Sequence, residues 1–508
     1  MSSAIIKSFF AFLFASIIVN NTVNAQATDP VVKTNKGYIR GVIENDIAVF
    51  KGVPYAAAPV GALRFMPAAE HTVWTDTLST QNFGSIATQA SCSKVSGTED
   101  CLSLNLYTPK ADNHKRAVMV WVHGGSMTNG AGKGNDGHAF ADRDDIVAVT
   151  INYRLGAFGF LYMGDVDKRY AASGNNGLLD CVMALKWIKQ NIAAFGGDPE
   201  RVTIMGESAG AKLISAVLVS PASKGLFQQY IAESGSVQCI RDTVTAKNER
   251  TMILKQMGLG PNDARKLLTL PADSIMKIQG IVCAGIGGNS FFGPVYDGVV
   301  IKEDAYHYAS GKDIPRIKAL IGTNQYEAAL FVSQQAWQNH PDTTILKPLF
   351  KDNEPLVYKT YLQQVKTLAP YAAAVNVLTQ YMYQMHSYRF AKILVNNGIP
   401  VWMYHFEYSD AKEYGARHAA ELQYVWNDHN MSITGTDAVK KQLAIGIHGA
   451  WVAFIKTGNP NVTTLPQWPL YKNDTRQVMT FDTVSKVNSL KEVFDDKAFP
   501  SAVFVMKK

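Results

Sequence analysis

Residues 202–210 read VTIMGESAG, and this stretch predicts a sharp turn between a β-strand and an α-helix. Its first four residues are apolar or β-branched, which favours a strand, and apolar side chains recur at helical spacing over residues 213–217. Gly206 and Gly210 flank Ser208 and permit a tight turn, so that the serine hydroxyl stands clear of the sheet. The pattern is typical of a nucleophile elbow, and an ordinary turn with a serine at the helix N-terminus is the alternative.

Strand-like and helical segments alternate along the rest of the chain. This alternation predicts an α/β protein with a mostly parallel sheet and helices on both faces. Residues 331–398 contain few glycines, and this composition predicts a helical excursion between two strands. Such an insertion could form one wall of the active-site pocket. No linker or repeat interrupts residues 26–508, which we expect to form one domain. The strand-like runs are 117–122, 146–151, 202–205, 319–321 and 401–406.

The first 25 residues have the composition of a secretory signal peptide. Lys7 precedes an apolar run over residues 9–19, and Val23-Asn24-Ala25 offers a cleavage site after Ala25. The apolar run is short for a membrane-spanning helix. We therefore expect the mature protein to be exported, either secreted or periplasmic, and an uncleaved N-terminal anchor is the alternative.

The five cysteines are compatible with an oxidising compartment, in which disulfide bonds can form. Two bonds would use four cysteines and leave one free thiol. A bridge between Cys92 and Cys101 would close a short loop, and a bridge between Cys239 and Cys283 would close a longer one. The connectivity is not determined by the sequence. Cys181 lies beside the apolar side of a helical pattern and is expected to be a buried thiol.

Charge and motif content argue against several classes of function. The formal net charge of +7 is small for 508 residues and is spread along the chain, so we expect no nucleic-acid partner. The sequence contains no Cys/His cluster with metal-ligand spacing and no phosphate-binding glycine loop after a first strand, so we expect neither a metal nor an organic cofactor. The oligomeric state stays open.

Residues 195–210, FGGDPERVTIMGESAG, resemble the serine signature of the type-B carboxylesterase family, whose relatives include the cholinesterases. The resemblance extends from KGVPY at residues 51–55 to TGNPN at residues 457–461. It implies an α/β-hydrolase fold with a helical insertion between the acid and histidine loops. It also implies a serine hydrolase that cleaves small-molecule carboxylic esters through an acyl-enzyme.

A serine nucleophile needs a base, and the base needs a third group that orients it. In α/β-hydrolases the acid and then the histidine follow the serine, each on a loop after a later strand. GTNQYE at residues 322–327 resembles the acid loop of the family and implies Glu327 as the acid. GARHAAEL at residues 415–422 resembles the histidine loop and implies His418 as the general base for Ser208.

The oxyanion formed during ester cleavage needs hydrogen-bond donors that are already in place. WVHGGS at residues 121–126 follows a strand-like run and resembles the oxyanion loop of the family. The resemblance implies the backbone N–H groups of Gly125, Ser126 and Ala209 as these donors. Ser126 stands where many relatives carry glycine or alanine.

Further landmarks of the family imply two structural ion pairs. Arg64 is expected to pair with Glu99, and Arg154 with Asp180. Buried pairs of this kind are costly to break by removing one partner.

Two other functions remain open at this point. The same fold includes adhesion proteins that have lost the nucleophile, and the presence of Ser208, Glu327 and His418 together argues against that class. A lipase that acts on long-chain acylglycerols also remains possible, because acyl-chain preference depends on the pocket and its lid. Choline esters are not expected substrates, since only eight residues separate Cys92 from Cys101 and none of them is aromatic.

Overall fold

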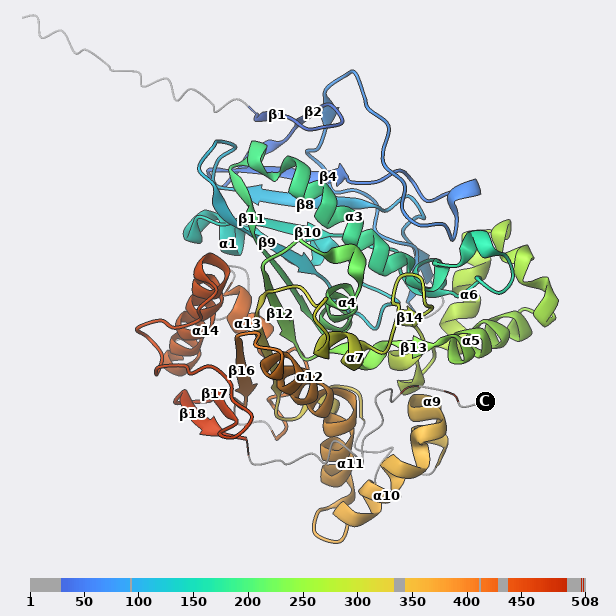
Figure 1. Cartoon of the computed structure of the whole chain (residues 1–508), viewed down its shortest axis with the longest axis vertical. Coiled ribbons are helices and arrows are strands. Elements are labelled where there is room, and N and C mark those ends of the chain that lie inside the picture. The colour runs from blue at the N-terminus through green and yellow to red at the C-terminus, as the bar shows by residue number, and fades with distance from the viewer. Residues whose placement is uncertain are drawn as a thin grey trace, which may run out of the picture.

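The computed structural model describes residues 29–91, 94–332, 343–410, 413–427 and 437–490, together with Phe504 and Met506. Its central feature is one eleven-stranded sheet (Figure 1). In spatial order its strands are β18 (Lys486–Ser489), β17 (Gln477–Phe481), β16 (Val401–Phe406), β15 (Lys318–Asn324), β12 (Gln229–Glu233), β11 (Gly197–Glu207), β9 (Arg116–Val122), β10 (Val147–Ile151), β8 (Ser103–Thr108), β4 (Ile47–Pro54) and β3 (Val42–Glu44).

The seven strands from β17 to β10 in this order run parallel, and the pairs nearer both edges are antiparallel. The expected α/β-hydrolase architecture with a mostly parallel sheet is therefore confirmed. The five strand-like runs of the sequence correspond to β9, β10, β11, β15 and β16.

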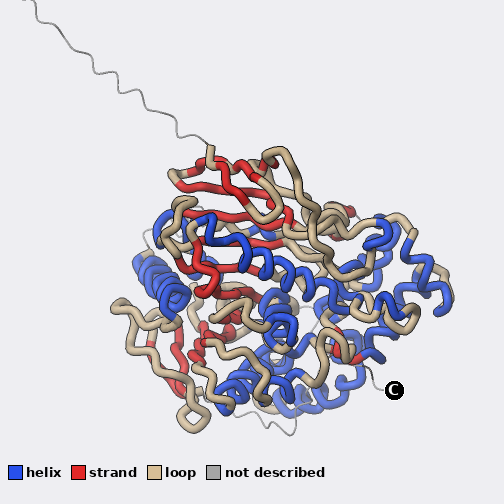
Figure 2. Tube along the Cα trace, turned by 45° about the horizontal axis from the view of Figure 1, so that its top comes forward, coloured by secondary structure: helices blue, strands red, loops and turns tan. Residues whose placement is uncertain are grey.

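Helices cover both faces of the sheet, which explains why its central strands are apolar along their whole length. In β9, Val118, Val120 and Val122 belong to the core on one face, whereas Met119 and Trp121 belong to the core on the other. Figure 2 shows the strands lying between these helical layers. The first face carries α3 (Asn176–Asn191), α4 (Ala209–Leu218) and α12 (Met385–Asn396), and the second carries α1 (His138–Asp144), α13 (Leu422–Trp426) and α14 (Ala438–Thr457).

The expected helical insertion lies between β15 and β16 and has a hydrophobic core of its own. Its aromatic and aliphatic side chains pack together with Phe504 from near the end of the chain. Residues 333–342 of this insertion lie outside the described residues. Before α12, the insertion contains α9 (Thr343–Phe350), α10 (Glu354–Gln364), α11 (Pro370–Thr379) and the π-helical turn η12 (Gln380–Gln384).

The remaining elements lie around this framework. The smaller sheets are β1 (Val31–Lys33), β2 (Tyr38–Arg40) and β5 (Leu78–Ser79); β6 (Gln89–Ser91) and β7 (Lys94–Ser96); and β13 (Arg241–Asp242) and β14 (Val295–Tyr296). The remaining α-helices among the described residues are α2 (Gly156–Phe160), α5 (Thr243–Gln256), α6 (Ala272–Val282) and α7 (Ala305–Ser310).

The expected bridge between Cys239 and Cys283 is not formed, because both residues are free thiols. Arg241 influences both thiols, while Lys212 acts on Cys239, and Glu249 and Lys351 act on Cys283. Burial raises the pKa of Cys239 to about 11 and that of Cys283 to about 12, so both thiols are protonated near neutral pH. The predicted pairing was wrong because a suitable number of residues between two cysteines does not by itself bring their side chains together.

Cys101 and Cys181 are also buried free thiols, as expected for Cys181. Cys92, the expected partner of Cys101, lies outside the described residues. The same holds for the segment 1–25, so the division into a signal peptide and a domain over residues 26–508 stays a prediction. Among the helices that the structure describes, none combines the length and the apolar character needed to span a membrane.

Candidate active site

Ser208 lies at the junction between β11, which ends at Glu207, and α4, which begins at Ala209. Its backbone angles, φ 57° and ψ −122°, are ones that a residue with a side chain rarely adopts. The Ser208 N–H donates to the carbonyl oxygen of Glu233 at 2.9 Å, and the Ser208 carbonyl accepts from the N–H of Lys212 at 3.0 Å. Neighbouring backbone therefore holds the strained turn that the sequence predicted.

The two glycines of the turn are required by close backbone packing. A Cβ atom at Gly210 would overlap the carbonyl oxygen of Val122, the last residue of β9. A Cβ at Gly206 would lie 2.8 Å from the same oxygen. Helix α4 can therefore begin directly against the neighbouring strand, which fixes the position of Ser208.

The structure brings Ser208, His418 and Glu327 into one hydrogen-bonded line. The Nε2 atom of His418 lies 2.7 Å from Ser208 Oγ, and its Nδ1 atom lies 2.6 Å from Glu327 Oε2. The three residues follow β11, β15 and β16, so each comes from the carboxyl end of a parallel strand. With Glu327 ionised, Nδ1 carries the imidazole proton, and Nε2 is left to accept the proton of the serine hydroxyl.

Glu327 is fully buried and is held on both sides of its carboxylate. Its Oε1 atom accepts the N–H of Asn324 at 2.8 Å, while Oε2 faces the histidine. The N–H of His418 also donates to the Glu327 carbonyl at 3.3 Å. These contacts fix the acid and the histidine relative to each other.

The loop that follows β9 places two backbone N–H groups beside the serine turn. Gly125 has φ 105° and Ser126 has φ 54°. Within the described part of the chain, neither N–H donates to a protein acceptor. Ala209 is the first residue of α4, where an N–H has no acceptor within the helix. The three expected donors are thus free to bind an external oxygen.

The comparisons with known proteins agree with this geometry. Residues 28–495 match the model of the carboxylesterase family. This chain belongs to the carboxylesterase family. It is 35% identical over 496 residues to para-nitrobenzyl esterase of Bacillus subtilis, covering 93% of this chain and 99% of the relative. It is 32% identical to phenmedipham hydrolase of Pseudarthrobacter oxydans, covering 89% and 95% of the two chains.

A solved structure gives the same result for the fold of this carboxylesterase. Carboxylesterase EST55 of Geobacillus stearothermophilus superposes with a TM-score of 0.81 at 35% identity. The match covers 90% of this chain and 97% of that chain. Family membership identifies the protein as a carboxylic ester hydrolase.

Glu207, the residue before the serine, is a site residue that sequence reasoning missed. Its Oε1 atom lies 3.1 Å from Nε2 of His418, on the nitrogen that faces Ser208. Burial, and next the charge of Glu327, raise the pKa of Glu207 well above its ordinary value. Glu207 is part of the serine motif, but the sequence does not show where its side chain points. Only the folded turn brings this side chain to His418.

The helical insertion contributes aromatic rings to the same place. Tyr383, from the π-helical turn η12, and Phe331 pack against the His418 ring, with ring centroids 4.6 Å and 5.2 Å away. π-Helical turns are often found at functional sites. The expectation that the insertion forms a wall of the pocket is borne out by these contacts.

A further buried carboxyl group, Glu421, supports the acid loop. Its Oε2 atom accepts from the side-chain amide of Asn324 at 2.5 Å, and the backbone N–H of Asn324 in turn binds Glu327. Burial, and then the charges of Glu207 and Glu327, raise the pKa of Glu421 to about 8. Glu421 is thus a positioning residue that is predominantly protonated at neutral pH.

Both expected ion pairs are present in the structure. Arg64 binds Glu99 through two hydrogen bonds of 2.8 Å and 2.5 Å. Arg154 binds the fully buried Asp180 through two of 2.8 Å and 2.6 Å. Each is a fork-like contact made by two hydrogen bonds from one guanidinium to one carboxylate.

A narrow pocket opens beside the serine. Its lining includes Ser126, Ser208, Ala209, Lys212, Arg241 and Tyr383. No group of three or more His, Cys, Asp or Glu side chains in the described ranges is arranged to hold a metal ion.

Proposed function

We propose that this protein hydrolyses small-molecule carboxylic esters through an acyl-enzyme formed on Ser208. The observation that carries the proposal is the hydrogen-bonded line from Ser208 Oγ through both nitrogens of His418 to Glu327, at 2.7 Å and 2.6 Å. A serine with a base at this distance, and a base held by a buried carboxylate, is the arrangement that activates a hydroxyl for acyl transfer.

In the first half of the proposed reaction, Ser208 Oγ attacks the carbonyl carbon while His418 Nε2 takes the hydroxyl proton. The carbonyl oxygen becomes an oxyanion, which accepts hydrogen bonds from the N–H groups of Gly125, Ser126 and Ala209. The intermediate collapses when the bond to the alcohol oxygen breaks. His418 gives its proton to the departing alcohol, and the acyl group stays on Ser208.

In the second half, a water molecule takes the place of the alcohol. His418 removes a proton from the water, which attacks the acyl carbon and forms a second oxyanion. The bond to Ser208 breaks, the serine oxygen takes the proton back from His418, and the carboxylic acid leaves. The charge on Glu327 stabilises the imidazolium in both halves and keeps the histidine in one orientation.

The geometry favours an esterase over the two alternatives. A non-catalytic binding protein has no need of a strained serine turn with a fully hydrogen-bonded histidine and acid. The narrow pocket favours short acyl groups over the long chains of a lipase substrate. The relatives named for para-nitrobenzyl ester and phenmedipham hydrolysis support small-molecule substrates.

The test compares the mature protein with Ser208→Ala on p-nitrophenyl esters from acetate to long-chain acyl groups at neutral pH. We expect the substitution to lower kcat on the order of 10⁴-fold or more, because it removes the nucleophile. Turnover should be highest with short acyl chains. Equal rates for the two proteins would contradict the proposal, and a preference for long chains would indicate a lipase.

We also propose that the protein is exported after cleavage behind Ala25. The proposal rests on the sequence of residues 1–25, in which Lys7 precedes an apolar segment and the Val23-Asn24-Ala25 cleavage site. Expression of the full-length chain in a secreting host should yield an extracytoplasmic protein whose N-terminal residue is Gln26. An intact N-terminus on the cell-associated protein would contradict it.

A further inference from the structure

Lys212 is a buried lysine one helical turn after the nucleophile. It lies on α4, only 6% of its surface is exposed, and it lines the same pocket as Ser208. Lysine is almost never buried to this extent unless a partner neutralises it. A bound group of opposite charge in the pocket would account for a buried lysine at this position.

Among the described residues, the Lys212 ammonium group forms no ion pair or hydrogen bond. Its Nζ atom lies over the face of the Tyr383 ring, 4.7 Å from the ring centroid. Burial lowers the pKa of Lys212, and Cys239, followed by Glu207 and Glu327, only partly opposes this. Neither of these two carboxyl groups lies within ion-pair distance of Nζ. An anion bound in the pocket would supply the missing counter-charge.

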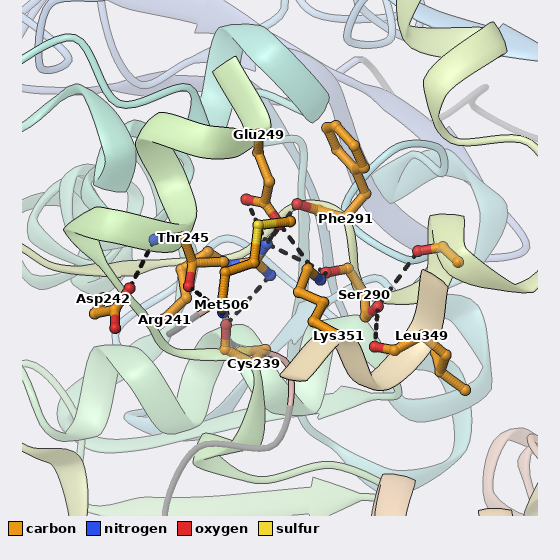
Figure 3. A network of polar contacts seen from close by, with 11 residues as sticks. Cys239, Arg241, Asp242, Thr245, Glu249, Ser290, Phe291, Leu349, Lys351 and Met506 are labelled. Atoms are coloured by element: carbon orange, nitrogen blue, oxygen red, sulfur yellow. Dashed lines mark hydrogen bonds and ion pairs between the residues drawn. The ribbon is translucent and has the colours of Figure 1, made fainter. Parts of the chain in front are cut away.

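A second group of charges lies behind the same pocket and adds to its positive potential. Arg241, which also lines the pocket, binds both carboxylate oxygens of Glu249, at 2.6 Å and 2.8 Å (Figure 3). Lys351 reaches the same carboxylate, with its Nζ 3.5 Å from Glu249 Oε1. Two cations thus share one carboxylate in this buried network.

The backbone around Arg241 does not offset this excess charge. Its guanidinium donates to the carbonyl oxygens of Ser290, at 3.2 Å, and of Phe291. Lys351 donates to the Ser290 carbonyl at 3.1 Å. These neutral oxygens orient the cations without cancelling their charge, so the cations among the described residues outnumber their carboxylate partner there.

The position of the pocket shows which part of an ester would meet these cations. During cleavage the departing alcohol must lie near His418 Nε2, because that atom protonates it. The pocket is lined instead by Ser126 and Ala209, whose N–H groups face the oxyanion, and by Lys212. The acyl group is therefore the part of the substrate that extends toward Lys212.

We propose that Lys212, assisted by Arg241, makes this esterase selective for esters whose acyl group ends in a carboxylate. The substrate class is the monoesters of short dicarboxylic acids, since the pocket is narrow. This inference rests on the proposed ester hydrolysis at Ser208 and adds the identity of the acyl group.

The test compares two ethyl esters of matched shape at pH 7. Monoethyl succinate carries an ionised carboxylate at this pH, and ethyl 4-methylpentanoate has a neutral isopropyl group in its place. Release of ethanol gives kcat/KM for each ester. We expect the native protein to favour the succinate ester at least tenfold, expressed as the ratio of the two constants.

Three variants identify the origin of that ratio. Lys212→Met should lower the ratio at least tenfold, and Lys212→Arg should keep most of it because the charge remains. Lys224→Met removes a lysine from the exposed turn that follows α4 and should leave the ratio unchanged. Because the readout is a ratio, it does not depend on the amount of active protein.

Two results would overturn the inference while leaving the proposed function intact. One is a native ratio near or below unity when p-nitrophenyl esters are still hydrolysed. The other is a ratio that Lys212→Met leaves unchanged. Absence of Ser208-dependent turnover of every ester would instead contradict the proposed function itself.

Discussion

At the scale of single residues, the site depends on which side chains face His418. The structure brings together Ser208, Glu327 and His418, as the resemblance of their motifs to the family's serine, acid and histidine loops, in that order along the chain, implied. Glu207 and Lys212 were missed, although both lie within four residues of the serine. Their roles depend on where buried side chains point, and spacing along the sequence does not determine this.

Glu207→Gln tests the effect of a carboxylate 3.1 Å from His418 Nε2. Because burial raises the pKa of Glu207, its carboxyl group is largely neutral beside neutral His418. The positive charge that forms on the imidazole in both halves of the proposed reaction favours the ionised form of Glu207, and the resulting attraction stabilises the imidazolium, so its loss raises the barrier. We expect kcat to fall about tenfold, equivalent to about 1.4 kcal/mol of transition-state stabilisation, with KM little changed. Steady-state kinetics on a p-nitrophenyl ester measure both constants.

Glu200→Gln is the matched control for this substitution. Glu200 lies on the same strand, β11, but its side chain is exposed and pairs with Lys189. Its replacement should leave kcat within a factor of about two, as expected for surface substitutions. Equal kcat values for Glu207→Gln and the native protein would show that the carboxylate has no part in the reaction.

At the scale of elements, the strand, turn and helix around Ser208 follow from local sequence. Gly206 and Gly210 predicted the tight turn, and the structure supplies the physical reason in the carbonyl of Val122 that faces both. The Cys239–Cys283 bridge was predicted wrongly at this scale. Two thiols on separate elements form a bridge only if tertiary packing aligns them, and local sequence does not encode that alignment.

Gly210→Ala tests the packing of α4 against β9. The added methyl group would overlap the Val122 carbonyl, so the helix must shift away from the strand. We expect a loss of about 2 kcal/mol in the free energy of unfolding, within the usual cost of overpacking, and reduced ester turnover because Ser208 moves. Denaturant unfolding and kinetics give the two values.

Gly134→Ala is the control for that substitution, because a Cβ there would meet no atom within 4 Å and the backbone has no positive φ. Its unfolding free energy should stay within about 0.5 kcal/mol of the native value. Similar losses for the two variants would mean that close packing at Gly210 is not what stabilises the turn.

At the scale of the whole molecule, the sheet and its two helical layers were predictable because apolar strands and helices alternate over hundreds of residues. The composition of residues 331–398 predicted the helical insertion, but not that its π-helical turn would place Tyr383 against both His418 and Lys212. The cluster of buried carboxyl groups at the site also arises only on folding, which brings Glu207, Glu327 and Glu421 together from three separate parts of the chain.

Glu421 should make the stability of the molecule depend on pH. Its pKa is about 8 in the folded protein against an ordinary value of 4.5, because burial and neighbouring carboxylates disfavour its charge. The folded state then holds more protons than the unfolded state between these two values, so the free energy of unfolding falls as pH rises from about 4.5 to about 8. In Glu421→Gln this fall should be smaller.

Urea unfolding of the native protein and Glu421→Gln at several pH values across that window measures the effect. Part of the slope should remain in the variant, since burial also raises the pKa of Glu207 and Glu233. The same slope in both proteins would show that Glu421 is not the group that releases a proton on unfolding.

The most direct test of the central claim is to trap the acyl-enzyme. The protein is mixed with a p-nitrophenyl ester, quenched in acid during the first turnovers, digested and analysed by mass spectrometry. We predict one acyl group, attached to Ser208 in the peptide that contains GESAG, and no such adduct with Ser208→Ala. Ester hydrolysis without an adduct, or an adduct on another residue, would contradict the mechanism.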